Sequence, residues 1–108
     1  MRKLLLAVIV SLSTVSTAAL AEIKVGIILG FTGPIESLTP AMRDGARMAF
    51  DEASNSGNLL GGESITILEA DSTCVDSAAA TAAAEGLVAD GVTAIMGADC
   101  SGVTGAIN

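Results

Sequence analysis

The side chains that could carry chemistry are few, and most of them lie in the second half of the chain. Cys74 and Cys100 are the only two cysteines, and Cys100 is followed directly by Ser101, with Thr104 shortly after it. Because the sequence contains no histidine, neither a Ser-His-Asp nor a Cys-His nucleophile can be assembled. The cysteines also lack the CxxC spacing of zinc sites. These patterns disfavour both catalysis and a metal site.

The amino terminus has the pattern of a cleavable export signal. A positively charged start is followed by the apolar stretch Leu4–Val10, and the small-x-small sequence Ala19–Ala21 gives a signal-peptidase site before Glu22. A retained membrane anchor would need about 20 apolar residues, but serine and threonine interrupt this run. We therefore expect residues 1–21 to be removed and the rest of the chain to reach the periplasm.

Export also bears on the two cysteines. A cysteine pair in an oxidising compartment is normally a disulfide, so we expect Cys74 and Cys100 to form one. Zinc ligation and a free catalytic thiol remain the weaker alternatives.

The composition bears on two questions: which partners the chain could bind, and whether it could form a complete folded unit by itself. The chain has 12 acidic and 5 basic residues and a net charge of −7, which disfavours nucleic acid as a partner. A unit as small as residues 22–108 buries only about 60–65% of its unfolded surface. With no Trp or Tyr and only two Phe, it has few large core residues. We therefore expect it to be part of a longer protein.

Hydrophobic patterning predicts strands that alternate with helices. Strands are expected at 23–29, 64–71 and 93–97. Helices are expected from a cap at Thr39 to Gly57, from Asp76 or Ser77 to Asp90, and from Ser101 onward. The inward stripes are expected to be Met42, Ala46, Ala49, Phe50 and Ala53 in the first helix, and Ala80, Ala83, Ala84, Leu87 and Val88 in the second. Arg47 is expected to pair with Asp51. The alternation implies an α/β fold, a parallel sheet with flanking helices.

Ligands of open α/β sheets bind beyond the carboxyl ends of the strands. Three segments follow the expected strands there: Gly30–Leu38, Asp71–Val75 and Ala98–Thr104. The third opens a helix, whose first turn has unpaired amides and a partial positive charge that attract a carboxylate. Ser101 and Thr104 add hydroxyl donors at the same place. The alternative is that Ser101 only caps its own helix.

A nucleotide-binding loop is disfavoured. The segment Gly30–Pro34 contains glycines, but the chain has no GxxxxGK[ST] sequence. A dinucleotide fingerprint would need a helix to open on its third glycine, whereas the expected loop continues after Pro34. No cofactor is therefore expected.

Four segments taken together indicate a protein family more specifically than any one of them does. They are IKVGIILGFTGP, DGARMAFDEA, EADSTC and GADCSGVT. In combination they resemble the branched-chain amino-acid-binding (Leu/Ile/Val-binding) family of type I periplasmic binding proteins. Members of that family have two α/β lobes joined by a hinge, and they deliver solutes to ABC transporters. The resemblance covers residues 22–108.

The resemblance implies a sheet order, a disulfide and a ligand site. The sheet order is 2-1-3, in an incomplete amino-terminal lobe, and the disulfide joins Cys74 to Cys100. Ser101 corresponds to the residue that binds the ligand's α-carboxylate, and Leu38 to the position where leucine-type binders pack an aromatic ring on the ligand. Asp99 and Thr104 complete the candidate ligand-binding residues. Because Leu38 is not aromatic, the expected ligands widen to other small carboxylates and amides.

The expected function is that of a non-enzymatic solute-binding component of an ABC importer, which captures an amino acid or similar solute between two lobes and passes it to a membrane permease. One alternative is a ligand-sensing domain of a receptor or regulator with the same fold. A less favoured alternative is a secreted nucleotide-binding enzyme. Residues 22–108 are expected to be a partial first lobe, which should not bind the ligand tightly alone.

Overall fold

A computed structural model describes residues 22–108, and the expected export signal lies outside the described residues. The described part contains three strands and three helices in strict alternation. They are β1 (Ile23–Leu29), α1 (Thr39–Asn55), β2 (Ile65–Asp71), α2 (Ser77–Ala89), β3 (Ala94–Gly97) and α3 (Ser101–Ile107). Each strand begins and ends within one residue of the prediction. No helix within residues 22–108 is long and apolar enough to cross a membrane.

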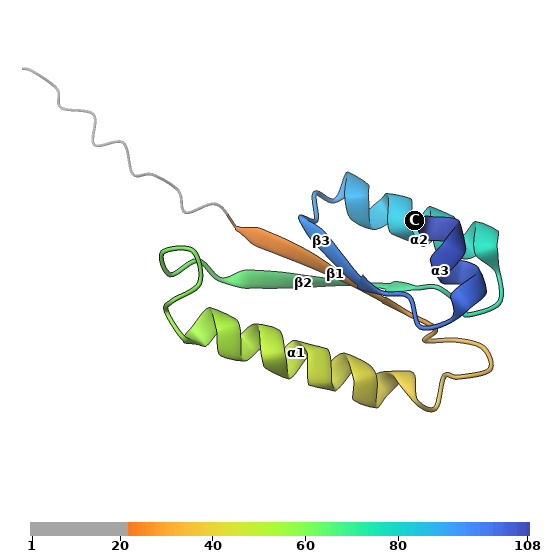
Figure 1. The fold of residues 1–108 in the computed structure, drawn as a ribbon, viewed down its shortest axis with the longest axis horizontal. Helices are drawn as coiled ribbons and strands as arrows, with labels where there is room; N and C mark the ends of the chain where they lie inside the picture. The colour runs from red at the N-terminus through yellow and green to blue at the C-terminus, as the bar shows by residue number, and fades with distance from the viewer. Residues whose placement is uncertain (1–21) are drawn as a thin grey trace, which may run out of the picture.

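The three strands form one parallel sheet in the order β2-β1-β3, which confirms the predicted order. Ile23 aligns with Ile65 on one side of β1, and Val25 aligns with Ala94 on the other. In Figure 1, α1 lies on one side of the sheet, and α2 and α3 lie on the other. All three strands point the same way, so the loops that follow them gather at one edge.

The central strand β1 contributes the largest fully buried side chains, because helices cover both faces of the sheet at this strand. Ile27, Ile28 and Leu29 are almost fully buried, which explains why this strand is a nearly continuous apolar run rather than an alternating one. Ile28 packs with Ala84 and Leu87 of α2 in one cluster. A Cβ added at Gly26 would lie 2.8 Å from Leu87 Cδ1, so glycine lets α2 approach the sheet closely.

The inward side of helix α1 agrees with the prediction at Ala46, Phe50 and Ala53, which are half-buried, but not at two other positions. Thr39 is fully buried, and Arg43, Ala46 and Phe50 are half-buried on the side that faces the sheet, whereas Met42 is 45% exposed. Ala49, also expected inside, is exposed as well. The expected Met42 and Ala49 positions were therefore wrong. The expected cap at Thr39 was wrong as well: Leu38 occupies the N-cap position without a capping side chain, and Thr39, the first residue of α1, donates its hydroxyl to the Gly30 carbonyl instead.

Two further contacts of the helices differ from the prediction. Arg47 pairs with Glu69 of β2 (Nε to Oε1, 2.7 Å) instead of Asp51, because α1 lies directly over that face of the sheet. Val88, expected inside, is 64% exposed, whereas Ala80, Ala84 and Leu87 of the same helix are buried as expected. The start of α2 was predicted correctly: Asp76 caps it by accepting from two backbone amides.

Candidate functional site

The loops that follow the three strands are joined to one another at the carboxyl edge of the sheet. The loop after β1 is bonded to the end of β2, because Asp71 accepts from Thr32. It is also bonded to the segment after β3, because Asp99 accepts from Gly30. The expected disulfide between Cys74 and Cys100 is present, with Cα atoms 5.2 Å apart, and joins the loops after β2 and β3. These bonds and the disulfide connect the three segments Gly30–Leu38, Asp71–Val75 and Ala98–Thr104. Together these segments are called the rim of the sheet.

Asp71 organises the loop that follows β1. Its Oδ2 accepts the Thr32 hydroxyl at 2.6 Å, and its Oδ1 accepts the Thr32 amide at 3.3 Å and the Thr73 amide at 2.8 Å. Partial burial raises the pKa of the Asp71 carboxyl, but the hydrogen bonds from Thr32, Thr73 and Phe31 together outweigh it and hold the pKa below its ordinary value. Asp71 is therefore an anchor that works in its ionised form.

Asp99, expected among the ligand-binding residues, directs its carboxylate toward the other loops. Oδ2 accepts the Gly30 amide at 2.9 Å, and Oδ1 is 3.5 Å from the Ser72 hydroxyl that donates to it. Asp99 is half-buried and Ser72 is fully buried. The carboxylate therefore connects the ends of all three strands.

Ser101 is exposed and occupies the first position of α3. The residue at the N-cap position is Cys100, and no side chain makes a capping hydrogen bond there. The alternative interpretation of Ser101 as the cap of its own helix therefore finds no such bond in the structure. Its hydroxyl lies at the rim. The two residues before it are held in place, Asp99 by its hydrogen bonds and Cys100 by the disulfide.

Thr104 and Leu38 are the other two candidate ligand-binding residues. The Thr104 hydroxyl is 2.9 Å from the Cys100 carbonyl and 3.1 Å from the Ala98 carbonyl. Since a hydroxyl has one proton, this bonding leaves Thr104 only acceptor lone pairs for a ligand, not the donor that was expected. Leu38, the residue before α1, is 61% exposed and offers an apolar surface.

Sequence reasoning did not single out Asp71, Thr32 or Ser72, although it marked the segments that contain them. The signal for Asp71 was an aspartate at the end of a strand and before Ser-Thr, which is typical of a side chain that bonds to the backbone two residues on. Asp71 does bond to the Thr73 amide. No local pattern indicates its second partner, which lies 39 residues away.

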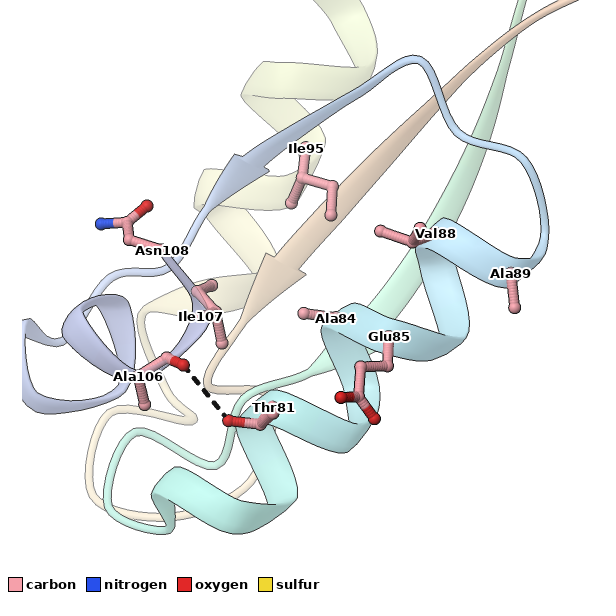
Figure 2. A pocket seen from close by; sticks show the side chains of 9 residues that line it. All are labelled: Thr81, Ala84, Glu85, Val88, Ala89, Ile95, Ala106, Ile107 and Asn108. Carbon is pink, nitrogen blue, oxygen red and sulfur yellow. Dashed lines mark hydrogen bonds between the residues drawn. The ribbon is translucent and has the colours of Figure 1, made fainter.

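The described residues also form an apolar hollow away from these loops. It is an apolar groove of about 420 Å³ between α2, Ile95 of β3 and the end of α3. Figure 2 shows Ala84, Val88 and Ile107 along it, with Thr81 bonded to the Ala106 carbonyl at one end. None of the four candidate ligand-binding residues lines this groove. Residues 22–108 also contain no group of three histidine, cysteine or acidic side chains placed to hold a metal ion.

Proteins named as binding proteins for branched-chain amino acids are similar to this chain. The Leu/Ile/Val-binding protein BraC3 of Rhizobium johnstonii is 31% identical to this chain over 101 residues, which are 94% of this chain and 27% of that protein. The branched-chain amino acid transporter substrate-binding protein LivJ of Streptococcus pneumoniae, solved in complex with isoleucine, has a TM-score of 0.71 and 28% identity over 81% of this chain and 25% of its own.

A possible leucine/isoleucine/valine-binding protein of Rhodopirellula baltica shares the fold, with a TM-score of 0.68 and 24% identity over 80% of this chain and 23% of its own. The chain spans about a quarter of the length of these relatives. Residues 22–108 match the family model described as periplasmic binding protein. Because that match covers the whole described part, the chain belongs to the periplasmic binding protein family.

Proposed function

We propose that this chain forms part of the first lobe of a solute-binding component of an ABC importer, which captures an amino acid or a similar small carboxylate or amide. The observation that carries this proposal is the match to binding proteins for branched-chain amino acids, one of them solved with isoleucine. The ligand would lie between this lobe and a second one, and a membrane permease would receive it.

Ser101 is the residue that we propose for the ligand's carboxylate. Its hydroxyl is exposed at the rim, and no capping bond competes for it. Leu38 would pack against the apolar part of the ligand, since most of its side chain is exposed. Thr104 would line the site with its remaining acceptor capacity. Asp99 lies at the base of the same segment, and its role is taken up below.

Export is part of the proposal. Residues 1–21 would act as a signal peptide and be removed before Glu22, and the folded protein would work in the periplasm. The disulfide between Cys74 and Cys100 is consistent with that compartment. The acidic charge of the chain argues against a nucleic-acid partner.

A ligand screen on the full-length protein that contains this sequence tests the proposal. Isoleucine, leucine and valine would be compared with glutamate, lysine and NAD by thermal unfolding and calorimetry. A ligand at about 100 times its Kd stabilises the folded state by about 2.7 kcal/mol, so at least one amino acid should raise the melting temperature. Stabilisation by NAD alone would contradict the proposal and favour a nucleotide-binding protein.

A further inference from the structure

Asp99, which follows β3, bonds to the segments that follow the other two strands of the sheet. Gly30 follows β1, Ser72 follows β2, and Asp99 itself follows β3. The carboxylate accepts the Gly30 amide at 2.9 Å through one oxygen and the Ser72 hydroxyl at 3.5 Å through the other. One side chain thus connects the three segments that bound the proposed ligand site.

The two donors match the two oxygens of one carboxylate. A carboxylate offers two acceptor oxygens and no donor, which matches one amide and one hydroxyl. Ser72 has no exposed surface, and Gly30 is buried as well. An apolar side chain at position 99 would leave both donors without this partner in a place with little access to water, which is unfavourable.

The same carboxylate fixes the chain immediately before Ser101. Cys100, the residue between Asp99 and Ser101, is also held by the disulfide to Cys74. After Ser101, the Thr104 hydroxyl bonds back to the Ala98 and Cys100 carbonyls. The Ser101 side chain is therefore exposed on a backbone that is anchored on both sides. A donor whose position is fixed before the ligand arrives loses less entropy on binding.

We propose that Asp99 is a positioning residue: it holds the loops after β1 and β2 against the segment that carries Ser101, and it acts on the ligand only through that segment. Both carboxylate oxygens already accept hydrogen bonds from the protein. The effect on ligand affinity rests on the proposed function, whereas the anchoring of Gly30 and Ser101 does not depend on any ligand.

Four variants of the full-length protein test this role. Asp99→Ala removes both acceptors, Asp99→Asn keeps the shape and one acceptor, and Ser72→Ala removes only one donor. The control is Asp76→Ala, which removes the cap of α2 and lowers stability but leaves both hydrogen bonds of Asp99 in place. The first measurement is made without ligand: hydrogen exchange at the Gly30 amide and ¹⁵N relaxation at Ser101.

In Asp99→Ala, exchange at Gly30 should accelerate about tenfold or more, because the amide loses a charged partner. Ser101 should become more mobile, Asp99→Asn should be intermediate, and Asp76→Ala should change neither signal. If exchange at Gly30 and mobility at Ser101 are unaltered in Asp99→Ala, the positioning role is wrong.

The second measurement compares isoleucine with 3-methylpentanoate, which is isoleucine without its amino group. Calorimetry of Asp99→Ala should show an affinity loss of about threefold to tenfold for both compounds, partly restored in Asp99→Asn. A loss confined to isoleucine would make Asp99 a direct ligand of the amino group and would overturn the proposal. If the unaltered protein bound neither compound, the proposed ligand class would fail, and the exchange at Gly30 would still decide the positioning role.

Discussion

At the scale of single residues, the end of the central strand is held from both sides. Asp71 at the end of β2 binds Thr32, and Asp99 after β3 binds Gly30, so two carboxylates fix one loop. The Gly30 carbonyl also accepts the Thr39 hydroxyl from the start of α1. The three partners come from the end of β2, the segment after β3 and the start of α1. A loop held in this way presents a defined surface rather than a flexible one.

The Asp71 anchor should make stability depend on pH in the acid range. Because the pKa of Asp71 is lower in the folded state, its contribution is fully present above the unfolded value of about 3.9 and is lost as the pH falls through the folded pKa. Asp71→Asn should therefore lower the free energy of unfolding by about 1 kcal/mol at pH 7 and flatten the decline of this free energy below about pH 4.

Urea unfolding at a series of pH values measures this effect. Thr32→Val removes the hydroxyl that bonds to Oδ2 and keeps the size of the side chain, so it should show part of the same flattening. An unchanged pH profile in Asp71→Asn would mean that the ionised carboxylate does not anchor the loop.

The sequence was sufficient to select the segments of the rim but not the bonds within them. The disulfide was expected because export places the cysteine pair in an oxidising compartment, and the structure contains it. The role of Ser101 toward a ligand stays a prediction. The partners of Asp99 lie 69 and 27 residues away, and local spacing carries no information on such pairs. Thr104 was expected to donate to a ligand, but a threonine in the first turn of a helix can bond to a nearby carbonyl instead.

At the scale of elements, boundaries were easier to predict than helix orientation. Strands β1, β2 and β3 begin and end within one residue of the predicted ranges, because apolar runs and turn residues define them locally. The inward side of α1 was predicted only in part: Ala46, Phe50 and Ala53 are half-buried as expected, but Met42 and Ala49 are exposed. Alanine, glycine and methionine occur on several sides of this helix and give its apolar stripe no sharp edge. Its orientation depends instead on Thr39 and on the ion pair between Arg47 and Glu69.

Two glycine substitutions should change stability in opposite directions. Gly26→Ala would place a Cβ 2.8 Å from Leu87 Cδ1, and Leu87 is only 3% exposed, so it has little room to move. This variant should lose about 1–2 kcal/mol. Gly86→Ala places its Cβ in open space on α2 and should gain about 0.5–1 kcal/mol from better helix propensity.

Urea denaturation of both variants beside the unaltered protein decides this prediction, and each variant serves as the control for the other. Equal stability of Gly26→Ala and the unaltered protein would show that α2 does not pack on β1 as closely as the structure indicates.

At the scale of the whole molecule, the described residues would provide one side of the proposed ligand site. The chain spans about a quarter of the length of its relatives, and the proposed ligand would be held between two lobes. β3 is an edge strand of the described sheet, and the apolar groove beside it is lined by Val88, Ile95 and Ile107. Neither feature belongs to the rim. The rim itself offers an exposed hydroxyl at Ser101 and an exposed apolar side chain at Leu38.

The most direct test of the account is the affinity of Ser101→Ala for isoleucine in the full-length protein, measured by calorimetry. Loss of one hydrogen bond to a charged carboxylate costs about 1.5–3 kcal/mol, so the affinity should fall about tenfold to a hundredfold. The melting temperature without ligand should stay the same, because no side-chain capping bond is lost. Ser77→Ala is the matched control, since Ser77 is also exposed and also begins a helix, and it should leave the affinity unaltered. Equal affinity of Ser101→Ala and the unaltered protein would contradict the carboxylate-binding role of Ser101.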